Sequence, residues 1–139
     1  MRIIALSLMF VITLQTGIPL AYAEIVGGSC KYKSYTGKAE ITSITRLEII
    51  RSEYSHEMYE IKFSFKPDQK ISEEFARMEG REYVLLLKNS SYPGPKFLEK
   101  YDLKVGKTLE CNMNVITKGA CTPIIFDFPS VRLDEYFEG

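Results

Sequence analysis

The sequence predicts a mainly β domain, a small antiparallel barrel of five strands with one short helix. Two observations lead to this prediction. Apolar and polar residues alternate with a period of two over most of the chain. The expected elements follow the order long strand, strand, helix, strand, connection, strand, strand, which suits a barrel of the oligonucleotide/oligosaccharide-binding (OB) type. An open antiparallel sheet with a helix packed against it is the alternative fold.

The first predicted strand runs from Gly37 to Ile50. Its odd positions are small or apolar, and its even positions are mainly charged or polar. At about 3.3 Å per residue such a strand would exceed roughly 45 Å, which is beyond the usual strand length. The strand must therefore bend or bulge, and Gly37 and Ser43 are the expected positions.

The second strand shows the clearest alternation and ends at Pro67. Its apolar positions are Tyr59, Ile61, Phe63 and Phe65. A helix is then predicted over Ile71–Glu79, because Ile71, Phe75 and Met78 have the spacing of one helix face. Gly80 follows as a usual helix stop.

The segment Tyr83–Leu87 is apolar on both faces, which predicts a central strand. Asn89–Pro95 is a loop by composition, and Phe97–Leu103 is ambiguous, with a short helical turn as one interpretation. An OB-type barrel has its helix between the third and fourth strands. In that fold Phe97–Leu103 would supply the helix, and Ile71–Glu79 would be an insertion.

The last two strands are expected to form a hairpin with a two-residue turn at Lys118-Gly119. The four pairs on its apolar face would be Val115 with Thr122, Met113 with Ile124, Cys111 with Phe126 and Leu109 with Phe128. A register shifted by one residue would mix the apolar and polar faces. The final residues, about 130–139, are predicted to form a loose acidic tail.

Residues 1–23 have the layout of a cleavable secretory signal. A positively charged start precedes the mostly apolar stretch Ile3–Leu14, and small residues mark a cleavage site after Ala23. The apolar stretch is shorter than the roughly 18–20 residues that span a bilayer. We therefore predict a periplasmic or secreted protein, with 24–139 as a single β-rich domain and no membrane span after cleavage.

Three cysteines, Cys30, Cys111 and Cys121, remain after this cleavage. Export to an oxidising compartment predicts one disulfide and one leftover thiol. In the expected hairpin, Cys111 and Cys121 lie on opposite faces and about 16 Å apart along the strands, whereas a disulfide needs Cα atoms within about 7 Å. Cys30 must then pair with one of these two cysteines. We predict a Cys30–Cys121 disulfide, which would tie the N-terminal arm to the hairpin, with Cys111 as a buried free thiol.

Several kinds of chemistry lack support in the sequence. Lys plus Arg and Asp plus Glu number 18 each, so the net charge is zero and nothing favours nucleic acid. The cysteine spacing lacks the Cys-x-x-Cys pairs of zinc sites, and there is no phosphate-binding glycine loop. We predict neither a metal nor another cofactor. The single histidine, His56, lies in the polar loop Arg51–Glu57 and is interpreted as solvated.

These exclusions favour an exported, soluble and monomeric binding or interaction module without catalysis. OB-type barrels bind ligands at the loops that join strands 1–2 and 4–5. By analogy Tyr54, His56 and Lys118 are the candidate ligand-binding residues, for a protein or a small ligand of the cell envelope. The alternatives are an envelope hydrolase or thiol enzyme that uses His56 or Cys111, and an inhibitor of a secreted enzyme with Glu24–Tyr35 as its inserted arm.

Overall fold

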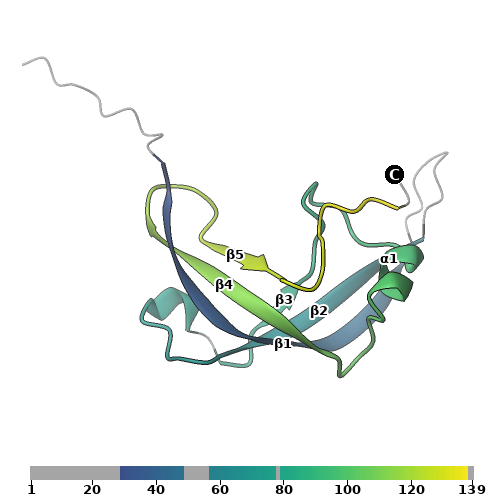
Figure 1. Ribbon diagram of the computed structural model, residues 1–139, viewed down its shortest axis with the longest axis horizontal. Coiled ribbons are helices and arrows are strands. Elements are labelled where there is room, and N and C mark those ends of the chain that lie inside the picture. Colours follow the sequence, from purple (N-terminus) through teal and green to yellow (C-terminus); the bar gives the residue numbers. More distant parts are fainter. Residues whose placement is uncertain (1–28, 49–56, 78, 138–139) are drawn as a thin grey trace, which may run out of the picture.

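The computed structural model describes residues 29–48, 57–77 and 79–137. The predicted signal segment, 1–23, and most of the first connection, 49–56, lie outside these residues. The described chain is mainly β, with five antiparallel strands in a curled half-barrel sheet and one short helix (Figure 1). The predicted fold class is therefore confirmed, and the half-barrel fits both a small barrel-like fold and an open sheet.

The strands are β1 (Lys31–Leu47), β2 (Met58–Pro67), β3 (Glu82–Val84), β4 (Thr108–Lys118) and β5 (Ile124–Asp127). A 3-10 turn, η1 (Glu74–Ala76), precedes β3, and the helix α1 (Pro95–Lys100) precedes β4. The sheet order is β3-β2-β1-β4-β5 with antiparallel neighbours throughout. The edge strands β3 and β5 run in the same direction, because each lies two antiparallel steps from β1.

The long central strand β1 contains the expected bulge. Its register against β2 shifts between Ile41 and Ser43, so Thr42 is the extra residue. A bulge moves the following side chains to the other face. Ile44 accordingly packs against the core, on the face that strict alternation assigned to polar residues. The strand also begins earlier than predicted, at Lys31.

Gly37 lies where β1 pairs with both neighbours, opposite Pro67 of β2 and Cys111 of β4. A Cβ atom at this position would collide with the carbonyl oxygen of Lys66 and with the ring of Phe65. Glycine is therefore required here, because only a residue without a side chain lets β1 and β2 approach so closely.

The helix predicted over Ile71–Glu79 is wrong, because only the short turn η1 forms there among the described residues. Ile71 is buried, whereas Phe75 is 49% exposed, so these two residues do not share an apolar face. A tertiary hydrogen bond is formed here in place of the helix. The backbone N–H of Ser72 donates to the hydroxyl of Tyr35 in β1, which holds this segment against the sheet instead of in a helix.

The helix of this fold is α1, which lies partly within the segment that the sequence left ambiguous, Phe97–Leu103. It is positioned between β3 and β4, as in OB-type barrels. Pro95 begins it and Phe97 is its fully buried anchor. Proline suits the first turn of a helix, because it has no N–H to leave unsatisfied there.

β3 is an edge strand and not the predicted central strand. Beyond its end, the N–H of Leu85 makes one more hydrogen bond to β2, to the carbonyl of Ile61 (2.8 Å). Its two apolar faces have different surroundings. Leu85 is buried, whereas Val84 and Leu86 are 38% and 37% exposed. The sequence resembled that of a central strand because both faces of this segment are apolar, although only one face is buried.

The β4–β5 hairpin has a longer connection than predicted, residues 119–123. Met113 faces Phe126 and Val115 faces Ile124, which is two residues away from the expected register. Because the shift is an even number, the predicted buried face is unchanged. Gly119 has a φ of +102°, which glycine alone adopts easily, and it begins the wider loop.

Residues 130–137, predicted to be a loose tail, pack against α1 and the core. Val131 is buried, and the carbonyl of Leu133 accepts a hydrogen bond from the N–H of Lys88 (2.8 Å). Tyr101, just after α1, donates its hydroxyl to Glu135 (2.8 Å). The expectation of a loose tail therefore does not hold for these residues.

Two clusters of buried side chains form the core. The larger includes Phe63, Leu85, Phe97, Phe128 and Val131. The smaller consists of Tyr35, Ile71, Ala76, Met113 and Val115. The rings of Tyr83 and Phe126, with centroids 4.6 Å apart, pack against both clusters and bridge the two edge strands. The smaller cluster underlies the site described below.

Cys30 and Cys121 form the predicted disulfide, with Cα atoms 6.2 Å apart, and Cys111 is free and buried. The bond joins the chain just before β1 to the β4–β5 connection. The predicted pairing holds despite the register error. In either register Cys111 lies well inside β4, whereas Cys121 lies beyond its end.

Candidate functional site

The ligand-binding site predicted from the sequence stays a prediction, because only one of its three residues belongs to the described chain. Lys118 ends β4 and pairs with Lys31 at the start of β1. Tyr54 and His56 lie outside the described residues.

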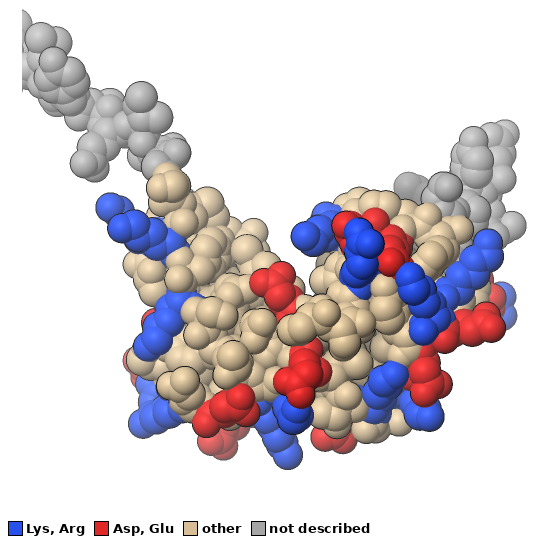
Figure 2. All heavy atoms as spheres, in the orientation of Figure 1, with Lys and Arg blue, Asp and Glu red and all other residues tan. Residues whose placement is uncertain are grey.

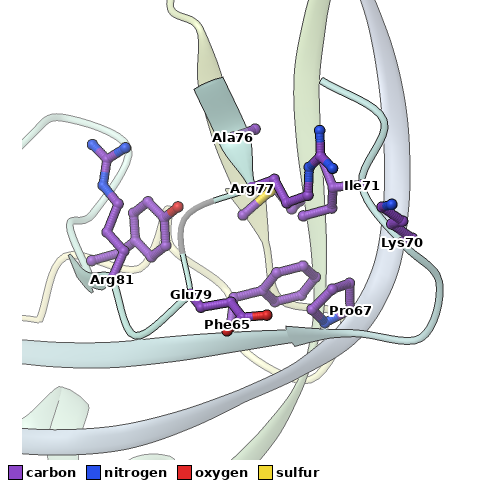
Figure 3. Close-up of a pocket in the computed structure, with 10 residues that line it drawn as sticks. Phe65, Pro67, Lys70, Ile71, Ala76, Arg77, Glu79 and Arg81 are labelled. Carbon is purple, nitrogen blue, oxygen red and sulfur yellow. The ribbon is translucent and has the colours of Figure 1, made fainter. Parts of the chain in front are cut away.

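A pocket of about 310 Å³ lies elsewhere, between the end of β2, the segment around η1, and β3. Its floor is apolar and comes from four separate parts of the chain. The floor residues are Phe65 and Pro67 of β2, Ile71 and Ala76 beside and within η1, Tyr83 of β3 and Met113 of β4. Figure 3 shows Phe65 and Pro67 side by side above β2, with Ile71 across the pocket from them.

The rim of this pocket carries most of its charge. Lys70, Arg77 and Arg81 supply three cations, and Glu79 supplies one carboxylate. In Figure 3, Lys70 and Arg77 lie on the side of Ile71, whereas Arg81 lies at the opposite end. The guanidinium of Arg81 is 5.0 Å from the centroid of the Tyr83 ring. Charged groups therefore surround an apolar floor.

A hydrogen-bond network fixes the segment that forms one wall of the pocket. The hydroxyl of Tyr35, in β1, donates to Oε2 of Glu73 (2.5 Å) and lies 2.7 Å from Oγ of Ser72. Lys33 also donates to Oγ of Ser72 (3.2 Å). The buried Tyr35 thus joins the wall to the central strand, and its hydrogen bond lowers the pKa of the Glu73 carboxyl below its ordinary value.

The described groups of this region suit binding better than thiol chemistry. Burial raises the pKa of the Tyr83 phenol above its ordinary value. The free thiol of Cys111 is buried, and burial raises its pKa to about 12. A thiol nucleophile needs a lowered pKa and access to substrate, so Cys111 does not support the thiol-enzyme alternative.

A second hollow, of about 490 Å³, separates β5 from the segment around β3. It corresponds to the notch in Figure 2, whose walls are mostly uncharged. Val84, Leu86 and Ile125 are partly exposed along it, and Lys88 and Asp127 are its charged lining residues. The smaller pocket is the better candidate, because ligand sites combine apolar walls with a few converging polar groups.

The comparisons with known proteins give no family for this chain: no family model, curated protein or solved structure matches it. Within residues 29–48, 57–77 and 79–137, no group of three or more His, Cys, Asp or Glu side chains could hold a metal ion. The helices of these same ranges include none that is long and apolar enough to cross a membrane.

Sequence reasoning missed the cations of the rim because they are separated along the chain. Lys70 and Arg81 lie on either side of the predicted helix and Arg77 lies within it, and charged residues at such positions are ordinarily solvated. Their common location depends on the fold-back of this segment onto Tyr35, which no local pattern shows. Composition gives no signal either, since residues 66–82 contain four Lys or Arg residues and five Asp or Glu residues.

Proposed function

We propose that this protein is an exported, soluble and non-catalytic binding module, and that the pocket beside η1 holds a small organic ligand. The observation that carries the proposal is the apolar floor enclosed by a charged rim. The pocket is at the small end of the roughly 300–1,000 Å³ that ligand sites occupy. Its wall is fixed by Tyr35, so the site is largely preformed, which reduces the entropy that binding costs.

The proposed export rests on the signal-like layout of residues 1–23. The Cys30–Cys121 disulfide supports it, because disulfides persist in oxidising compartments such as the periplasm and the extracellular space. We propose either location for the mature chain.

The test is titration of the mature protein with N-phenyl-1-naphthylamine, a neutral apolar dye that fluoresces when bound in apolar surroundings. We expect saturable binding with one dye per chain. Ala76 is buried in the floor, so Ala76→Leu should weaken dye binding and the larger Ala76→Phe should weaken it at least tenfold. Urea unfolding of each variant shows whether it has folded.

The matched control is Val105→Phe, which adds the same ring at a position that is 61% exposed and not part of the pocket. This variant should bind the dye like the wild type. The competing site is the hollow beside β5, which Ile125→Lys would make charged. Loss of binding in Ile125→Lys, with unchanged binding in folded Ala76→Leu and Ala76→Phe, would contradict the proposed site.

A further inference from the structure

The charge of the pocket rim is unusual for this chain. The whole sequence is neutral, and many surface cations are paired, as in Lys38–Glu110, Lys100–Glu135 and Arg132–Asp134. The rim instead combines three cations with one carboxylate, a local excess of two positive charges. Among the described residues, no ion pair engages Lys70 or Arg77.

The placement of these cations matches a ligand with two chemically different parts. Phe65, Ile71 and Met113 form an apolar surface on the pocket floor, where a hydrocarbon chain or ring would be removed from contact with water. Lys70 and Arg77 stand at the mouth on one side (Figure 3). An acidic group at the mouth could contact both, and arginine in particular can donate two parallel hydrogen bonds to a carboxylate or phosphate.

From this arrangement we propose that the ligand is an amphipathic anion, with its apolar part on the pocket floor and its acidic headgroup between Lys70 and Arg77. This inference rests on the proposed function, because it names the ligand class of the same pocket. The apolar contacts supply most of the affinity, since exposed ion pairs contribute little each. The rim cations select the sign of the headgroup.

The test compares four amphiphiles that share a ten-carbon chain, each used below its micelle-forming concentration. They are decanoate, decyl phosphate, decyltrimethylammonium and decyl maltoside, and each competes with the neutral dye. We expect decanoate or decyl phosphate to bind at least tenfold more tightly than decyltrimethylammonium. The tighter of the two anions identifies the headgroup. Because salt screens exposed charges, raising the ionic strength should reduce this preference.

The diagnostic variant is Lys70→Gln with Arg77→Gln, which keeps the floor intact and removes two rim charges. In the same dye competition, the ratio of its affinities for decanoate and decyltrimethylammonium should lose the preference for anions. The control, Lys31→Gln with Lys118→Gln, removes two charges where the start of β1 pairs with the end of β4, and it should keep that preference.

The outcomes separate the two proposals. Dye binding with equal affinity for anionic and cationic amphiphiles would overturn the ligand class and leave the binding module standing. An anion preference that persists in the Lys70→Gln, Arg77→Gln variant would also overturn it, because other groups would then select the headgroup. Failure of the dye and of all four amphiphiles to bind would overturn the proposed function itself.

Discussion

Removing the disulfide should cost this protein a large part of its stability. Cys30 and Cys121 are 91 positions apart, so the bond closes a loop that contains nearly the whole sheet. The chain-entropy relation for a loop of this length gives about 4.6 kcal/mol at 25 °C. The free energy of unfolding of a small domain is only about 5–15 kcal/mol, so this loss would be a large fraction of the total stability.

The perturbation is the double substitution Cys30→Ala with Cys121→Ala, which avoids mispairing with Cys111. Urea unfolding of the mature chain measures the effect. With a slope of about 1.5 kcal/mol/M, the midpoint should fall by about 3 M. Wild-type protein kept in a reducing agent should reproduce the same midpoint. A loss below about 1 kcal/mol with an unchanged slope would refute the reasoning, because the cross-link would then not restrict the unfolded chain.

Three further outcomes are expected. Gly119→Ala should lower the free energy of unfolding more than Gly106→Ala: both glycines have positive φ, but only at Gly119 would a Cβ meet the disulfide, 2.6 Å from a sulfur. The positive φ alone should cost each variant about 1–2 kcal/mol. Equal losses in the free energy of unfolding, measured in urea for the two variants, would contradict the contact at Gly119. Tyr35→Phe should cost about 1–2 kcal/mol at neutral pH. The hydrogen bond from Tyr35 lowers the folded pKa of Glu73, so the ionised Glu73 stabilises the fold at pH values above its unfolded pKa of about 4.3. This stabilisation is lost as the pH falls through the folded pKa. Tyr35→Phe lacks the hydrogen bond, so its free energy of unfolding should fall less than that of the wild type when the pH is lowered. Cys111, with a pKa of about 12, should resist alkylation at pH 8 in the native protein, and mass spectrometry should find one alkylated thiol after unfolding without reduction.

Local pattern was enough for the elements whose side chains alternate cleanly. The alternating residues of β2 and β4 predicted both strands and their buried faces, and the cysteine argument depended on the positions of Cys111 and Cys121 along the hairpin. Pattern failed where a distant residue decides the structure. The hydroxyl of Tyr35 holds Ser72 in place of a helix, and the bulge at Thr42 changes which face of β1 is buried.

The candidate site was harder to predict from the sequence than the fold. Tyr54, His56 and Lys118 were chosen by analogy with a closed barrel, and that analogy supplies no side-chain positions. The pocket instead depends on a fold-back of the segment around η1 onto β1, which brings Ile71 beside Met113. Residues so far apart in the chain carry no joint signal in one sequence.

The open side of the half-barrel leaves two strand edges that could pair with other molecules of the same protein. Unpaired edges are templates for aggregation, especially when they are long and apolar. Here β3 has three residues and β5 has four, so an added strand could gain only a few backbone hydrogen bonds on either side. Short edges thus let the sheet stay open without promoting fibrils, and lengthening either strand by mutation would remove that protection.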